Sequence, residues 1–242
     1  MAEGDHGGAP AGVRWGMGDA VLGMLLSLTF SIVVTTIVIS ALDLSADEFD
    51  DLPLWGVALL QVPLWAGLVG VPLYATHAKG SRSLRRDFGL WMQRRDAWFG
   101  PVVGLTSQFG LALLLIPLYD VLGVDRSKVG DTAESLTDRA DDLVGIVLLF
   151  LVVVVGAGVF EELFYRGLVL RSIQKRFGDV AAVLGSGLVF GLMHFNAVET
   201  IPLVLFGFVL AWLAVRSGRL GPGIWAHMAF NMTTLVSLLL SR

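Results

Sequence analysis

The sequence predicts an all-α fold, a polytopic transmembrane helical bundle with about seven to eight membrane helices. Apolar residues make up 55% of the 242 residues and charged residues only 16%, and the mean hydropathy is +0.74. A water-soluble domain of this size is normally less apolar. The apolar residues also gather into runs close to the roughly 20 residues that a helix needs to cross a bilayer.

Seven such runs follow one another along the chain. They cover residues 21–42, 53–75, 99–119, 143–160, 180–195, 201–215 and 223–240. An eighth helix is expected if the amphipathic stretch after Glu161 folds separately.

The first 18 residues are predicted to form a disordered tail ahead of a single membrane domain over 19–242. The segment MAEGDHGGAPAG is small, polar and glycine-rich, and it lacks a periodic apolar pattern. Within the membrane domain, the motifs with polar side chains concentrate in residues 143–240.

Charge asymmetry between the loops predicts the orientation. The loop DLSADEFDD, residues 43–51, carries five acids and no base, whereas residues 77–96 contain six lysines and arginines. Because basic loops stay in the cytoplasm, we expect this second loop, the other basic loops and the N-terminus to lie there. The chain is expected to be a multi-pass integral protein of a bacterial cell membrane, with the lipid bilayer as a partner and no nucleic-acid partner.

The chain contains no cysteine. Disulfides, thiolate chemistry and cysteine-ligated zinc are therefore excluded as the basis of function.

The stretch GVFEELFYRGL, residues 158–168, places three charged side chains directly after an apolar run. On a helix, Glu162 and Arg166 are four residues apart on one face, in the order that favours an ion pair. Glu161 is rotated by about 100° from Glu162 and cannot share that face equally. Arg166 is therefore expected to neutralise one glutamate and leave the other free.

Two further polar groups lie on later apolar runs. In FGLMHF, Phe190 and His194 are four residues apart; in HMAFN, His227 and Asn231 have the same spacing. A lone membrane histidine or a Glu–Arg pair at a helix end is more often structural, stabilising a helix contact or an interface. Three such groups on separate spans are hard to explain as structure alone and predict a functional site.

Together the three patterns, EExxxR, FxxxH and HxxxN, resemble those of the CPBP family of intramembrane proteases. This family includes the CAAX prenyl endopeptidases and the bacteriocin-processing or immunity proteins of the Abi group. The resemblance covers roughly the last hundred residues. Each motif alone is weak, but all three in order on separate membrane helices form a specific signal. Tyr165 stands where the family commonly has phenylalanine.

The resemblance implies metal-independent hydrolysis of a peptide bond by an activated water, without a covalent intermediate. It assigns Glu161 as the general base and His194 as the group that holds the water. His227 and Asn231 would stabilise the oxyanion, as an imidazole and an amide N–H can. The expected substrate is a membrane-presented peptide or protein, lipidated or not, and no cofactor is expected.

Supporting roles are expected for Glu162 and Arg166, as an orienting ion pair, and for Phe190, which would pack beside the site. Spacing alone leaves open the swapped assignment with Glu162 as the base.

Three alternatives stay open from the sequence. Glu161, His194 and His227 could supply a carboxylate and two imidazoles to zinc, although HExxH is absent and Asn231 would be unexplained. Intramembrane Glu and His also serve proton movement in transporters, which more often show a repeat. A noncatalytic scaffold or immunity-type protein could retain the same residues.

Overall fold

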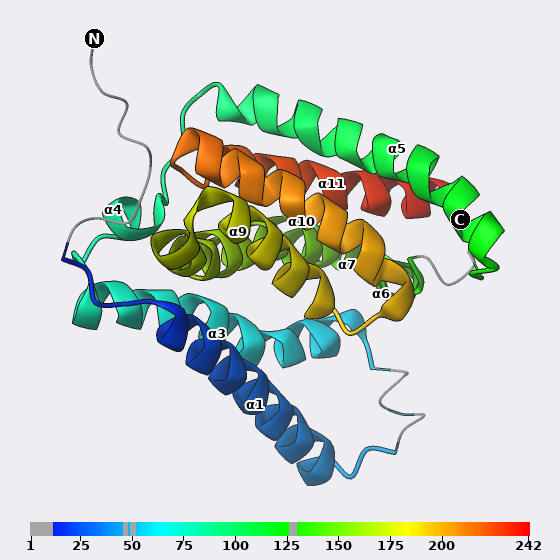
Figure 1. The fold of residues 1–242 in the computed structure, drawn as a ribbon. Coiled ribbons are helices and arrows are strands. Elements are labelled where there is room, and N and C mark those ends of the chain that lie inside the picture. Colours follow the sequence, from blue (N-terminus) through cyan, green and yellow to red (C-terminus); the bar gives the residue numbers. More distant parts are fainter. Residues whose placement is uncertain (1–11, 46–47, 49–51, 126–129) are drawn as a thin grey trace.

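The structure, a computed structural model, describes residues 12–45, 48, 52–125 and 130–242 (Figure 1). Residues 1–11 of the predicted disordered tail, and parts of the acidic loops over 43–51 and 120–142, lie outside the described residues. All regular structure in the described ranges is helical, so the all-α prediction is confirmed there.

The α-helices in chain order are α1 (Met17–Ala41), α3 (Leu54–Lys79), α4 (Leu84–Phe88), α5 (Asp96–Leu122), α6 (Asp131–Asp138), α7 (Leu143–Leu149), α8 (Ala157–Glu161), α9 (Leu170–Leu192), α10 (Ala197–Ser217) and α11 (Gly221–Leu240). Two π-helical stretches, η2 (Phe150–Gly156) and η3 (Glu162–Val169), flank α8.

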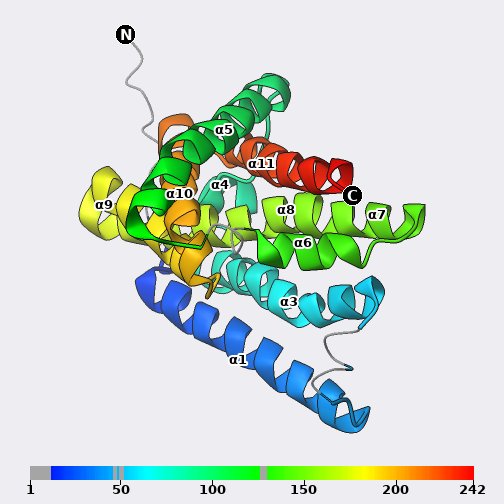
Figure 2. The same ribbon diagram turned by 90° about the vertical axis from the view of Figure 1, so that its right-hand side faces the viewer.

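The bundle is arranged in layers. Helices α1 and α3 form one side, α5 and α11 form the other, and the run containing α7 and α8 lies between them (Figures 1 and 2). Helix α10 packs on α9. The middle layer is therefore enclosed by helices from both halves of the chain.

Large apolar side chains cover the outside of this bundle. Leu113, Leu143 and Val144 are 79%, 74% and 73% exposed. A water-soluble protein rarely shows so much contiguous apolar surface, whereas lipid tails solvate it. Together with the hydropathy of the helices, this surface identifies a multi-pass membrane protein.

Six helices in the described residues are long and apolar enough to cross a bilayer, against the predicted seven to eight, and this count takes Leu143–Leu192 as one although two helices meet in it at Gly178. Two of the predicted spans, 143–160 and 180–195, belong to one helical run, Leu143–Leu192. The run does not stop at residue 160 but continues through Glu161 and Arg166 and changes direction at Gly178.

Gly178 reverses the chain sharply. Its φ of 81° and ψ of −178° are non-helical, and this region of backbone conformation is essentially restricted to glycine. Beyond it the chain packs back on itself: the Ser186 hydroxyl donates to the Tyr165 carbonyl at 2.9 Å, and the rings of Tyr165 and Phe190 lie 5.3 Å apart.

The reversal places the first two motifs at the same depth. Tyr165 follows Glu161 by four residues and Phe190 precedes His194 by four, so the contact between the Tyr165 and Phe190 rings brings the two motifs to a similar level. If the predicted spans simply alternated across the membrane, His194 would lie at the opposite face from Glu161. That conflict arose because one span was predicted to end at residue 160.

Replacing Gly178 with alanine is expected to lower the midpoint temperature of unfolding in detergent. Space around the added Cβ is open, so the cost, about 1–3 kcal/mol, comes from the backbone conformation alone. Gly70→Ala is the matched control, because its Cβ also meets open space but lies inside helix α3. An unchanged midpoint for Gly178→Ala would contradict the assigned turn.

The basic connections meet at one end of the bundle. The Leu220 amide donates to the Gly89 carbonyl at 2.8 Å, and Lys175 Nζ donates to the Trp15 carbonyl at 2.9 Å. At the opposite end, the Tyr119 hydroxyl donates to the Val198 carbonyl at 2.7 Å. The segments predicted to share a side of the membrane are thus neighbours in space.

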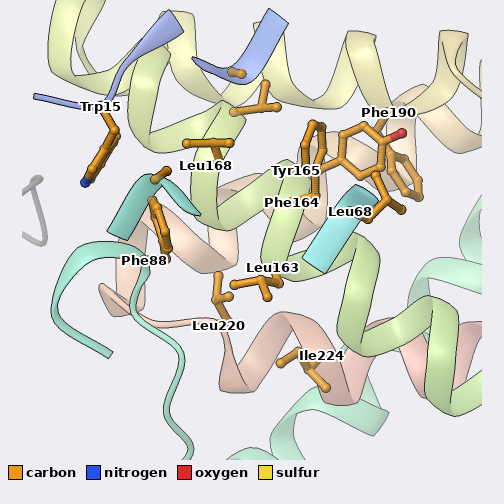
Figure 3. Close-up of a cluster of buried hydrophobic side chains, with 13 residues drawn as sticks. Trp15, Leu68, Phe88, Leu163, Phe164, Tyr165, Leu168, Phe190, Leu220 and Ile224 are labelled. Atoms are coloured by element: carbon orange, nitrogen blue, oxygen red, sulfur yellow. The ribbon is translucent and has the colours of Figure 1, made fainter. Parts of the chain in front are cut away.

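The residues just before and at the start of helix α1 are packed against the bundle. Helix α1 begins at Met17, and Trp15 is fully buried with its ring 4.9 Å from that of Phe88. Figure 3 shows Trp15 and Phe88 at the edge of a cluster that continues through Leu168 and Phe164 toward Phe190. This core anchors the segment that carries the glutamates.

Candidate active site

The two glutamates lie where the helix changes its hydrogen-bonding pattern. Glu161 is the last residue of α8, and Glu162 is the first of the π-helical stretch η3. π-Helical turns are rare and occur frequently at functional sites. The local backbone thus singles out the same position that the EExxxR motif does.

Glu162 and Arg166 form the predicted ion pair, and both side chains are completely buried. Arg166 donates through Nη1 to Glu162 Oε1 at 2.8 Å and through Nη2 to the Gly207 carbonyl at 3.2 Å. Its guanidinium carbon lies 4.2 Å from the centre of the Phe190 ring, a cation–π contact. The arginine is therefore fixed by contacts to three different elements.

His227 lies between the two glutamates. Its Nδ1 is 3.1 Å from Glu162 Oε1, and its Nε2 is 4.0 Å from Glu161 Oε2. The ring is held edge-to-face by Phe190 and Phe206, at centroid distances of 5.6 and 5.8 Å. The third motif therefore meets the first directly, as the sequence predicts.

The environments of the two acids differ. The Glu161 side chain is 16% exposed and that of Glu162 is fully buried. Oε2 of each acid is buried without a hydrogen-bond partner among the described residues, but Glu162 Oε1 interacts with both Arg166 and His227. Glu161 is thus the less constrained of the two acids and the one whose side chain is partly exposed.

His194 lies at the exposed end of α9, next to Phe190. Its Nδ1 is 2.8 Å from the Phe190 carbonyl, and the two rings are 4.9 Å apart. A carbonyl only accepts hydrogen bonds, so Nδ1 carries the proton and Nε2 of a neutral ring is an acceptor. Phe190 connects this histidine to His227, since its ring contacts both.

Asn231 extends from α11 toward the first π-helical stretch. Its Nδ2 donates to the Val153 carbonyl at 2.8 Å. An amide nitrogen has two hydrogens, so this bond leaves one for another acceptor. Asn231 therefore lies one helical turn beyond His227, and one of its two amide hydrogens is used in the bond to Val153.

Two contributors were missed from the sequence. The Phe206 ring packs against His227 and stacks on Phe230 at 3.9 Å, and the Gly207 carbonyl accepts from Arg166. Phe206 and Gly207 lie inside an apolar run without polar neighbours, so no sequence signal distinguished them.

A zinc site is not formed by the residues described. Among them, no group of three or more His, Asp or Glu side chains is arranged to hold a metal ion. Glu161, His194 and His227 therefore do not form the ligand set that the zinc alternative needs.

Comparison with known proteins bears on residues 143–233. This range matches the family model described as Type II CAAX prenyl endopeptidase Rce1-like, and it contains all three motifs. A Bacillus subtilis (strain 168) protein named "Putative membrane peptidase YdiL" is 22% identical over 140 residues, which are 55% of this chain and 57% of that protein. The matched region thus spans little more than half of this curated relative. No solved structure matches significantly.

Proposed function

Because residues 143–233 match the family model of the Rce1-like CAAX prenyl endopeptidases, we propose that the chain is an intramembrane endopeptidase with Glu161 as its general base. It hydrolyses a peptide bond in a membrane-presented peptide or protein, using water activated without a metal. The observation that carries this proposal is the position of His227 between a constrained, neutralised Glu162 and an accessible Glu161.

The proposed reaction begins at Glu161. Its carboxylate takes a proton from water as the water oxygen bonds to the substrate carbonyl carbon. His194 orients that water, since its Nε2 is an acceptor when Nδ1 donates to the Phe190 carbonyl. Glu161 then returns the proton to the amine nitrogen as the carbon–nitrogen bond breaks.

The oxyanion is stabilised by His227 and Asn231 in this proposal. The Nδ1 of His227 faces Glu162, an acceptor, and therefore carries a hydrogen. Its Nε2 can donate to an oxyanion only if it carries a hydrogen too, and the remaining amide hydrogen of Asn231 is the second donor.

The site is proposed to open toward the cytoplasmic half of the membrane. The basic segments that meet at one end of the bundle would face the cytoplasm. His227 lies close to that end of its helix, since α11 begins only six residues before it, and Glu161 lies at the level of His227, which it contacts. A substrate that presents a flexible segment near the inner membrane surface fits this depth.

The proposal is tested by mapping new peptide termini in membrane proteomes. Cells that express the wild type are compared with cells that express Glu161→Gln, which keeps the shape of the side chain and removes the base. We expect a set of termini that depends on Glu161. Identical sets of termini from both strains would contradict an endopeptidase function and favour a scaffold.

A further inference from the structure

Gly223 lies directly against the carboxylate of Glu162. It is the third residue of α11, after Gly221 and Pro222. A Cβ built on Gly223 would lie 2.8 Å from Glu162 Oε2, closer than real Cβ contacts allow. The nearest atom outside Glu162, the Leu210 carbonyl oxygen, would be 3.9 Å away, an ordinary van der Waals contact. The packing of α11 against its neighbours therefore leaves room for a side chain at position 223, whereas the Glu162 carboxylate does not.

Glu162 has little freedom to move away. Its Oε1 accepts from Arg166 at 2.8 Å and lies 3.1 Å from His227 Nδ1, and its side chain has no exposed surface. Arg166 is itself held by the Gly207 carbonyl and the Phe190 ring. Any shift of the Glu162 carboxylate would therefore disturb its contact with His227, the other partner of Oε1.

We infer that Gly223 is a positioning residue of the active site, required because it leaves room for Glu162 to reach Arg166 and His227 with the same oxygen atom. It acts through Glu162 on His227 and does not touch the substrate. The inference rests on the proposed function for its effect on catalysis, while its structural part concerns only the Glu162–His227 contact.

The direct test is Gly223→Ala in the full-length protein reconstituted in liposomes, with a peptide identified by terminus mapping. We expect kcat to fall on the order of 10- to 100-fold, since misplacing a catalytic group by a fraction of an ångström to 1 Å has effects of this size. KM should stay unchanged because Gly223 does not touch the substrate, and the midpoint temperature should change little because the higher helix propensity of alanine offsets the strained contact. Gly110→Ala, whose Cβ meets open space in α5, is the matched control and should retain wild-type kcat.

A double-variant cycle separates positioning from packing. Glu162→Asp shortens the acid by one methylene group and moves its carboxylate away from Gly223. In that background Gly223→Ala should lower kcat by a much smaller factor than in the wild type. Equal losses of kcat in both backgrounds, or wild-type kcat for Gly223→Ala alone, would overturn the inference.

Ring ¹⁵N NMR of histidine-labelled protein gives a readout independent of cleavage. Gly223→Ala should shift the His227 ring signals, which His227→Ala identifies by their loss, and leave those of His77 in place. If the wild type cleaves no peptide but the His227 signals shift, the proposed function fails and the positioning role stands. If the wild type cleaves and the His227 signals do not shift, the positioning role fails and the function stands.

Discussion

Replacing Arg166 with methionine is expected to destabilise the protein by about 3–5 kcal/mol, the cost of removing one partner from a buried ion pair. Arg166 has no exposed surface and makes hydrogen bonds to Glu162 and to the Gly207 carbonyl. Without it, Glu162 would be a buried carboxylate with His227 as its remaining partner. Thermal unfolding in detergent, followed by circular dichroism, measures the loss.

A compensating variant shows whether the charge is the cause. Arg166→Met combined with Glu162→Gln removes both charges, and replacing a buried pair is far less costly than breaking it. The double variant should therefore recover much of the lost stability. A single Arg166→Met variant as stable as the wild type would contradict the buried pair.

Replacing His227 with alanine is expected to slow peptide cleavage on the order of 100- to 1000-fold, the usual effect of losing an oxyanion donor. Folding should persist, because Glu162 keeps its bond to Arg166. Initial cleavage rates in liposomes measure the effect, and the unfolding midpoint reports on the fold.

His77→Ala is the matched control for this substitution. His77 is exposed near the end of α3, with Nδ1 on the Leu73 carbonyl, and its loss should leave the cleavage rate unchanged. Wild-type turnover by His227→Ala would contradict the assignment of His227 to the oxyanion.

The Glu162–Arg166 pair was predictable because it is local. Spacing of four residues on one helix sets the contact, and the structure confirms it. The resemblance to the CPBP proteases was likewise predictable from three short motifs, and the family match confirms it. Roles of the individual residues in catalysis remain predictions.

Other features depend on contacts that no local pattern reveals. The turn at Gly178 is marked only by one glycine in a basic, amphipathic segment, so the sequence did not show that the helices before and after it form one continuous run. The position of His227 against both acids follows from how α11 packs on α8 and η3, and Gly223 resembles an ordinary turn glycine in GPG. Its importance appears only when Glu162 is seen 2.8 Å from the missing Cβ.

Activation of the water by Glu161 is tested by the cleavage rate of purified Glu161→Gln in liposomes with a mapped peptide substrate. We expect no cleavage above protein-free liposomes, at an unfolding midpoint equal to that of the wild type. Cleavage by Glu161→Gln at the wild-type rate would contradict it.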